Sequence, residues 1–149
     1  AKDYSEFNFC GLTNGIRGYL NHVHPWVAFK PARYTEIVVD LDTLTSFKEI
    51  RYGVMNGYGQ EAVAPKSVDI EISNDSISFK RIVSKKFTYT IENKWQMFEQ
   101  KFNFESQKAR YVKLRFKNGK LPHNLGDFPV PKEREGEPGL LFIDEIEIK

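Results

Sequence analysis

The chain is built largely from short stretches in which apolar and polar residues alternate. The clearest is SVDIEIS, residues 67–73, whose Val68, Ile70 and Ile72 fall on one side. Successive side chains of a β-strand point to opposite faces, so this pattern predicts a strand with one buried face. No segment shows the period of an amphipathic helix. Further strands are predicted at 35–41, 47–55, 78–83, 87–91, 95–104, 109–117 and 139–149.

Turn-forming residues separate these strands, as in DTLTS after residue 41 and SNDS at 73–76. Many short strands joined by turns are typical of an antiparallel sandwich or barrel. The 149 residues suit one domain, spanning 1–149, with a single core. Residues 12–29 and 118–138 fit no strand. The second region is rich in glycine and proline, and either a functional loop or a surface excursion would explain it.

The charge distribution argues against two classes of partner. The net charge is only +2, and basic residues are interleaved with acidic ones, whereas a nucleic-acid-binding protein usually has a clustered basic face. No apolar run approaches the roughly 20 residues of a membrane span. The single cysteine, Cys10, cannot form an internal disulfide and is expected to be a small buried apolar group.

Residues 12–29 contain candidate binding side chains. His22 and His24 would share one face of a strand, but two ligands are too few for a zinc site, so a packed or surface pair is the better interpretation. The Trp26 ring could stack on a sugar or fill the core. Together with His22 and His24, Tyr19 is the better candidate for the tip of a binding loop.

The segment VMNGYGQEAVAPK, residues 54–66, is a second candidate binding loop. Asn56, Tyr58, Gln60 and Glu61 would offer amide and carboxylate groups and an aromatic ring to a ligand, and the glycines at 57 and 59 permit an unusual backbone path. A plain connection between two strands explains the same composition.

No residue pattern indicates catalysis. Glu145 and Glu147 would lie on one face of one strand, whereas a glycosidase needs two acids on opposite sides of its substrate. The sequence has no serine–histidine–aspartate order, phosphate loop or zinc motif. We therefore expect that the chain is not itself an enzyme.

The ordered set of segments LTNGIRG, WVAF, IVVDL, FKEIRYGVM, PKSVDIEIS, SFKRI, ARYVKLRFK and LFIDEIEI closely resembles a discoidin-type module. Such modules are also called F5/8 type C domains, and their sugar-binding members form carbohydrate-binding module family 32. The combination of GKLP and LLFIDEI is most similar to the module near the C-terminus of bacterial family 20 β-hexosaminidases. The resemblance covers nearly the whole chain and implies a jelly-roll β-sandwich whose loops form the binding surface.

The resemblance also implies a structural calcium ion. Many relatives bind calcium between an Asp-Gly of the first loop and a Glu of the last strand, and the matching positions here are Asn14, Gly15 and Glu145. An asparagine offers a neutral amide oxygen in place of a carboxylate, which should weaken the site. A turn at Asn14 and a hydrogen-bonding role for Glu145 are the alternative.

The function that the resemblance implies is non-catalytic glycan binding by an ancillary module. Its ligand would be a galactose- or N-acetylhexosamine-type glycan, and its parent a larger glycoside hydrolase outside the cell, on its surface or in the periplasm. We expect a monomer. Galactose-binding relatives carry an arginine where this chain has Met55 and Asn56, which argues against galactose. The alternatives are a structural or protein-contacting domain without a sugar site and a lipid-surface binder.

Overall fold

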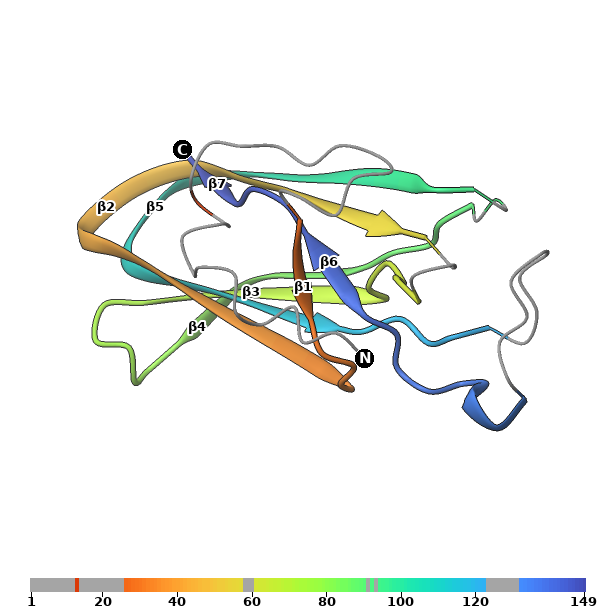
Figure 1. Cartoon of the computed structure of the whole chain (residues 1–149). Coiled ribbons are helices and arrows are strands. Elements are labelled where there is room, and N and C mark those ends of the chain that lie inside the picture. The colour runs from red at the N-terminus through yellow and green to blue at the C-terminus, as the bar shows by residue number, and fades with distance from the viewer. Residues whose placement is uncertain (1–12, 14–25, 58–60, 91, 93, 123–131) are drawn as a thin grey trace.

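The computed structural model describes residues 13, 26–57, 61–90, 92, 94–122 and 132–149. Within them the chain forms antiparallel strands and one short 3-10 turn (Figure 1). The elements are β1 (Val27–Phe29), β2 (Tyr34–Asn56), β3 (Ser67–Ser73), β4 (Lys80–Lys86), β5 (Gln96–Lys117), η4 (Lys132–Arg134), β6 (Leu141–Ile143) and β7 (Glu147–Ile148).

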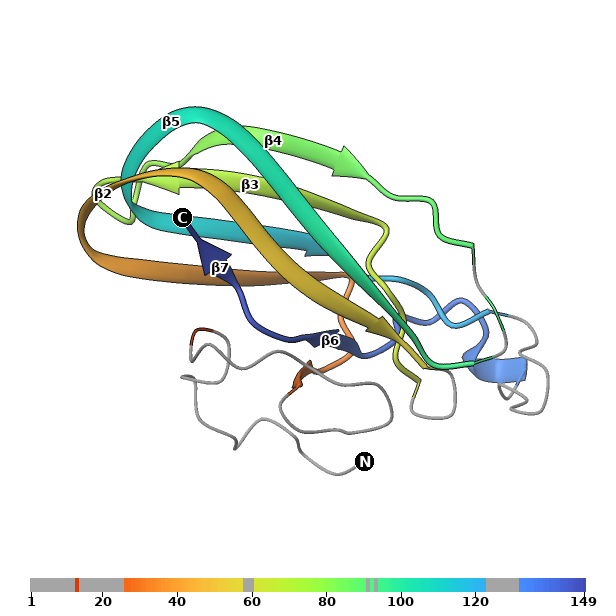
Figure 2. The ribbon, with the colours of Figure 1, turned by 90° about the horizontal axis from the view of Figure 1, so that it is seen from above.

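Two long strands, β2 and β5, connect the two layers of the molecule. They pair with each other from Tyr34↔Lys117 to Asn56↔Gln96, with register shifts near Asp40 and Phe47. At these shifts both strands curve back on themselves, as Figure 2 shows at the end of the molecule where β2 and β5 turn. Each strand therefore contributes one half to each layer.

The layers follow from this bend. The first half of β2 and the second half of β5 continue into β3 and β4, giving the order β2-β5-β3-β4. The second half of β2 pairs with the first half of β5 on one side and with β6 and β7 on the other, and β6 carries β1 on its far side. The predicted all-β sandwich is confirmed.

The main core lies between the two layers. Its members alternate along the strands with exposed residues, so one face of each strand is apolar, as the sequence pattern predicts. Aromatic rings fill the centre: Tyr52 meets Phe116 edge-on at 5.3 Å and stacks with Phe102 at 6.2 Å between ring centroids. The fully buried members include Ile50, Tyr52, Val54, Val68, Ile70, Val112, Leu114, Phe116, Leu141 and Ile143.

A second, smaller apolar cluster involves the alternate residues of β1, β2 and β6. Val54 belongs to the main core, and the adjacent Met55 packs with Phe142 and Trp26 in this second cluster. Because neighbouring residues of a strand point to opposite faces, the end of β2 is buried on both sides. This explains why the alternation of the sequence fades between residues 52 and 57.

Two predicted boundaries were wrong because the long strands continue through apparent turns. Residues 35–41 and 47–55 form the single strand β2, and 95–104 and 109–117 form β5. The turn-like residues after position 41 do distort the backbone, since Asp42 has a φ of 66°. The distortion is a bulge that bends the strand without ending it, because β5 bends alongside and pairing resumes at Thr45.

The other departures lie at strand ends. The strand expected at 78–83 is β4, shifted to 80–86, and residues 87–90 lie beyond it without strand pairing. The last predicted strand, 139–149, is interrupted, because residues 144–146 leave the ladder between β6 and β7. The predicted strand 67–73 coincides with β3.

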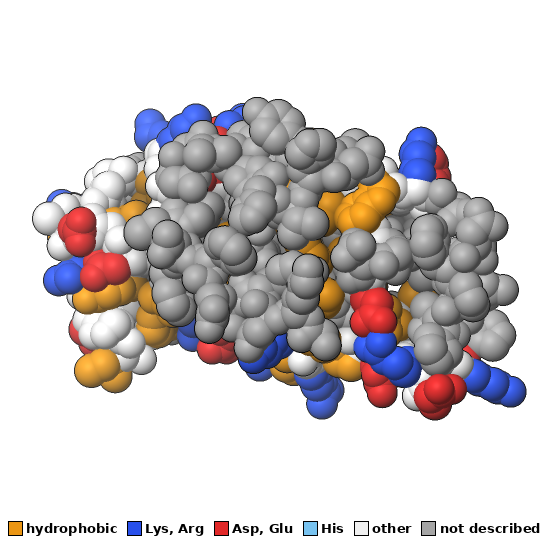
Figure 3. All heavy atoms as spheres, in the orientation of Figure 1, with side chains coloured by type: hydrophobic (Ala, Val, Ile, Leu, Met, Phe, Trp, Pro, Cys, Tyr) orange, Lys and Arg blue, Asp and Glu red, His pale blue; other side chains and the backbone are white. Residues whose placement is uncertain are grey.

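The surface carries both signs of charge, as the sequence indicates (Figure 3). Ion pairs cross the strands of the outer faces, for example Lys113–Glu71 at 2.9 Å and Arg115–Glu36 at 3.1 Å. Among the described residues, no helix is long and apolar enough to cross a membrane.

The core contains one polar atom whose removal should stabilise the fold. The Tyr52 side chain is fully buried, and its hydroxyl has no hydrogen-bond partner among the described residues. Burial, with a smaller electrostatic contribution from Tyr89, raises the pKa of this hydroxyl well above its usual range. Replacing it with hydrogen keeps the ring packing and removes an unsatisfied group.

We expect Tyr52→Phe to raise the free energy of unfolding by about 1 kcal/mol. Urea denaturation of both proteins measures the difference. Tyr89→Phe is the matched control, because the Tyr89 hydroxyl accepts a hydrogen bond from Gln100 Nε2 at 3.5 Å and its loss should not stabilise. A clear destabilisation by Tyr52→Phe would contradict the assignment.

Candidate functional site

A cavity lies at the end of the sandwich opposite the bend of β2 and β5. It has a volume of about 210 Å³ and lies where β2 ends, β3 begins and β5 ends. Its described lining combines one buried amide, one aromatic ring, two lysines and small apolar groups: Asn56, Val63, Ala64, Lys66, Tyr89, Gly119, Lys120 and Pro122. A cavity of this size is large enough for part of a small polar ligand.

Asn56 is the buried amide in the lining of this cavity. Its side chain is fully buried, and its Oδ1 accepts a hydrogen bond from the backbone N–H of Ala64 at 3.3 Å. Its Nδ2 has no hydrogen-bond partner among the described residues. A buried amide with unused N–H groups is costly unless a ligand or water accepts from it, so Asn56 is suited to bind an acceptor in the cavity.

The loop beyond Asn56 is held closed at its base. Gly57 and Ala62 exchange two backbone hydrogen bonds of 3.0 Å each, and Ala62 also lies beside Leu140. Trp95 packs directly on Gly57, where a Cβ atom would stand 2.2 Å from the ring. Only glycine fits this approach, so Gly57 lets the Trp95 ring hold the end of β2 in place.

Of the other predicted binding residues, the structure describes only Trp26 and Glu61. Trp26 is only 5% exposed and packs with Met55 and Phe142, which favours the core role that the sequence left open. Tyr19, His22, His24, Tyr58 and Gln60 lie outside the described residues, so their roles remain predictions. Asn56 alone of the predicted set is placed at the cavity.

The candidate loop 54–66 included Val63, Ala64 and Lys66 without singling them out, and sequence reasoning missed the other side chains around the cavity. Tyr89 was assigned to a strand, although it follows β4 and packs against Phe98 at 4.5 Å between ring centroids. Lys66 and Lys120 carried no signal, because each is one lysine among many in a chain with mixed charge. Their convergence depends on the strand ends that only the fold brings together.

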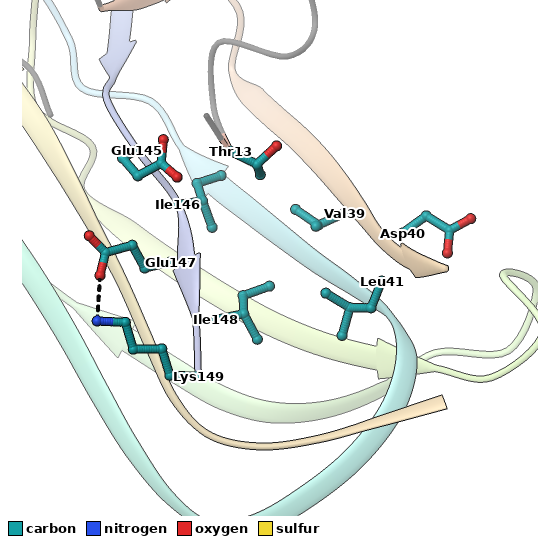
Figure 4. Close-up of a pocket in the computed structure, with 9 residues that line it drawn as sticks. All are labelled: Thr13, Val39, Asp40, Leu41, Glu145, Ile146, Glu147, Ile148 and Lys149. Atoms are coloured by element: carbon teal, nitrogen blue, oxygen red, sulfur yellow. Dashed lines mark ion pairs between the residues drawn. The ribbon is translucent and has the colours of Figure 1, made fainter. Parts of the chain in front are cut away.

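The predicted metal ligand Glu145 lies in a different region. It lines a cleft of about 350 Å³ together with Thr13 and residues of β2 and β7 (Figure 4). Glu145 is 4% exposed, and in Figure 4 it lies at the same end of the cleft as Thr13, the described residue that precedes Asn14. Asn14 itself lies outside the described residues.

The acids on either side of Glu145, Asp144 and Glu147, form hydrogen bonds or ion pairs with residues of β2 and the C-terminus. Asp144 Oδ1 accepts a hydrogen bond of 2.6 Å from the backbone N–H of Gly53. Glu147 Oε2 bonds to Arg51 Nη2 at 2.6 Å and to Lys149 Nζ at 3.1 Å. Among the described residues, no group of three or more His, Cys, Asp or Glu side chains could hold a metal ion.

Comparison with known proteins identifies the fold and the family. The model for the F5/8 type C domain matches residues 11–126. The chain belongs to the F5/8 type C domain family. These domains are non-catalytic modules, so the chain is not itself an enzyme. No curated protein sequence matches this F5/8 type C domain significantly.

Solved structures of carbohydrate-binding modules share the fold of this F5/8 type C domain. The module CBM32-1 from a family 31 glycoside hydrolase of Clostridium perfringens has a TM-score of 0.58 at 15% identity, covering 97% of this chain and 86% of that one. Chitosan-binding module 1 of a Paenibacillus chitosanase/glucanase has a TM-score of 0.58 at 15% identity, with coverages of 93% and 86%.

A third similar structure is the C-terminal domain of a chitobiase from Bacteroides fragilis. Its TM-score is 0.57 at 18% identity, and the match covers 95% of this chain and 79% of that one. The discoidin-type resemblance read from the sequence is therefore confirmed.

The ion pairs of Glu147 generate a prediction about pH. Burial raises the pKa of Glu147, but hydrogen bonds from Lys149 and Arg51 together outweigh it, so the pKa lies below its ordinary value of 4.5. A carboxyl whose pKa is lower in the folded state than in the unfolded state stabilises the fold at a pH above its ordinary pKa. This contribution is lost as the pH falls through the lowered pKa. Wild type should therefore lose more stability than Glu147→Gln on acidification below about pH 4.5.

Thermal melting of both proteins from neutral to acidic pH measures this difference. Glu105→Gln is the control, because Glu105 is an exposed acid of β5 that forms no ion pair with a described residue. Equal pH profiles for wild type and Glu147→Gln would contradict the prediction.

Proposed function

We propose that this F5/8 type C domain is a carbohydrate-binding module that recognises a glycan at the end of the sandwich where the cavity lies. The observation that carries the proposal is the buried Asn56 amide, which lines the cavity together with Tyr89 and whose Nδ2 has no hydrogen-bond partner among the described residues. Sugar hydroxyls accept hydrogen bonds from such donors, and aromatic side chains in binding sites pack against the apolar parts of a ligand.

The loops predicted from the sequence extend the same site. Tyr58 and Gln60 belong to the loop whose base is closed by Gly57 and Ala62, next to Asn56. Tyr19, His22 and His24 precede Trp26, which packs with Ala62 in the second apolar cluster. A shallow site of this kind binds weakly, with a dissociation constant in the range of about 1 μM to 1 mM.

The module would act by tethering. A weak sugar site raises the local concentration of an attached catalytic domain on its glycan, so it adds affinity without adding chemistry. We propose a secreted or surface-attached glycoside hydrolase as the parent and a monomeric module spanning 1–149. Similar folds occur as modules of a chitobiase, a chitosanase/glucanase and a family 31 glycoside hydrolase, which supports a glycoside hydrolase parent. The ligand type, galactose-like or N-acetylhexosamine-like, follows from the family resemblance alone.

A glycan array followed by calorimetry tests the sugar site. We expect Asn56→Ala to weaken glycan binding about tenfold, because it removes the buried donor. Asn118→Ala is the matched control: Asn118 is also buried, accepts one hydrogen bond, from Thr35 Oγ1 at 3.0 Å, and has an amide nitrogen without a partner among the described residues. It does not line the cavity, so its replacement should cost stability and leave affinity unchanged.

Loop variants extend the test to the predicted residues. Tyr58→Ala and His24→Ala should also lower affinity, whereas Tyr111→Ala, a partly exposed tyrosine of β5 that pairs with Asp40 beside the bend, should not. If wild type bound no glycan at high protein concentration, the carbohydrate-binding proposal would fail, and a structural or protein-contacting role would take its place.

We also propose that Glu145 and Asn14 hold a structural calcium ion, completed by backbone carbonyls of residues 11–17. The proposal is supported by the buried carboxylate of Glu145, which lines the same cleft as Thr13, because a carboxylate is a ligand that suits a hard cation. Such an ion would supply a fixed positive charge that ties the first loop to the segment between β6 and β7. The neutral Asn14 amide should make its binding weak.

Melting curves in calcium and in EDTA test this site. A ligand that binds only the folded state raises the melting temperature, so we expect a lower midpoint in EDTA. Glu145→Gln should abolish the difference, and Glu147→Gln should retain it, because Glu147 is bound to Arg51. The same midpoint in calcium and EDTA for wild type would refute the calcium site.

A further inference from the structure

The cavity at the open end of the sandwich is lined by hydrogen-bond donors with positive charge. Asn56 offers its buried amide N–H groups, and Lys66 and Lys120 offer ammonium groups. No aspartate or glutamate is among the described residues that line it. Donors and positive charge in one small space favour a ligand group rich in acceptors and negative in charge.

These two lysines are not neutralised by the part of the chain that the structure describes. Neither Lys66 nor Lys120 forms an ion pair with a described carboxylate, whereas Lys101 and Lys113 are paired with Glu49 and Glu71. A ligand anion would therefore not have to displace an existing partner, which removes one cost of binding.

Two acids in segments next to the cavity, Glu61 and Glu137, are bound by one arginine. Glu61, which precedes the cavity-lining residues 63 and 64, is bound by both terminal nitrogens of Arg134, and Glu137 also bonds to Arg134 at 3.2 Å. The backbone carbonyl of Glu137 accepts a hydrogen bond from the backbone N–H of Leu121, the residue that follows Lys120. Arg134 thus binds Glu61 and Glu137, so these two carboxylates are not free to pair with the lysines.

Two more lysines extend the positive charge beyond the cavity. The backbone N–H of Lys66 donates to Lys117 at 2.8 Å, and Ser67 lies between Lys117 on one side and Lys86 on the other. Neither Lys86 nor Lys117 has an ion pair with a described carboxylate. Four lysines at the ends of β3, β4 and β5 therefore form a basic rim, defined as Lys66, Lys86, Lys117 and Lys120.

We propose that the ligand of this cavity is an acidic glycan, in which a sugar ring carries a carboxylate or a sulfate that binds Lys66 and Lys120. This inference rests on the proposed sugar-binding function and specifies its ligand class. The anionic group accepts from both ammonium groups, and the Asn56 amide donates to an oxygen of the same ring. The Tyr89 ring bounds the cavity beside them.

The affinity should depend on salt. The lysines are exposed, so their attraction for an anion is screened by mobile ions and contributes less at high ionic strength. Contacts that use only the amide and the aromatic ring would be nearly independent of salt. Salt dependence thus separates charge recognition from general sugar binding.

Isothermal calorimetry with matched glycans tests the proposal. The probes are an oligosaccharide of galacturonic acid, its uncharged methyl ester, a sulfated galactan oligosaccharide, its desulfated form and a cationic chitosan oligosaccharide. We expect at least one acidic probe to bind about fivefold more tightly than its own uncharged form, as two exposed charge contacts would give. The preference should fall when NaCl is raised from about 20 mM to about 500 mM. Comparison of the carboxylate and sulfate pairs identifies the anionic group.

The double variant K66Q/K120Q should lose the preference and bind the acidic probe no better than its uncharged form. The matched control is K48Q/K80Q, which removes the same charge from two exposed lysines near the bend of the molecule. It should keep the preference, since a change of net charge alone does not alter the cavity.

The outcomes distinguish the two proposals. If the acidic and uncharged forms bound equally, or if the control variant lost the preference as fully as K66Q/K120Q, the acidic-glycan inference would be overturned and the sugar site would stand. Tighter binding of the chitosan probe would overturn it as well. Absence of binding to every probe, charged or neutral, would overturn both the inference and the proposed function.

Discussion

The pairing of β2 with β5 around a shared bend is the constraint on which the rest of the structure depends. The ladder runs from Tyr34↔Lys117 to Asn56↔Gln96, so each strand belongs to both layers. Because the two strands are hydrogen-bonded on both sides of the bend, the layers cannot slide past each other without breaking the ladder. The aromatic contacts of Tyr52, Phe102 and Phe116 then fill the space that this fixed arrangement encloses.

The same constraint creates the opposite, open end. There β2 and β5 end and β3 begins, and the connecting segments must satisfy their backbone groups outside the main ladder. Short bridges do so, between Gly57 and Ala62 and between Lys120 and Pro138. The cavity forms between these segments, so its position follows from where the strands end. Asn56 is the last residue of β2, which places a buried amide in its lining.

Charged residues are arranged differently on the faces of the sheets and at the open end of the sandwich. On the sheet faces, ion pairs cross between strands, as in Lys113–Glu71 and Arg115–Glu36. At the open end Arg134 binds both Glu61 and Glu137, while the lysines of the basic rim have no such partner among the described residues. Local pairing therefore leaves positive charge beside the cavity in a chain whose net charge is only +2.

The sequence by itself determined the fold class, because alternating residues such as Val68, Ile70 and Ile72 can bury one face only as a strand. It also identified Asn56 as a binding candidate and the family from its ordered segments. Only the tertiary structure decided that residues 35–55 form one bent strand, since the bulge at Asp42 resembles a turn locally and depends on pairing with β5. The convergence of Lys66, Tyr89 and Lys120 likewise required the structure, because contacts between residues so far apart in the chain leave no local pattern.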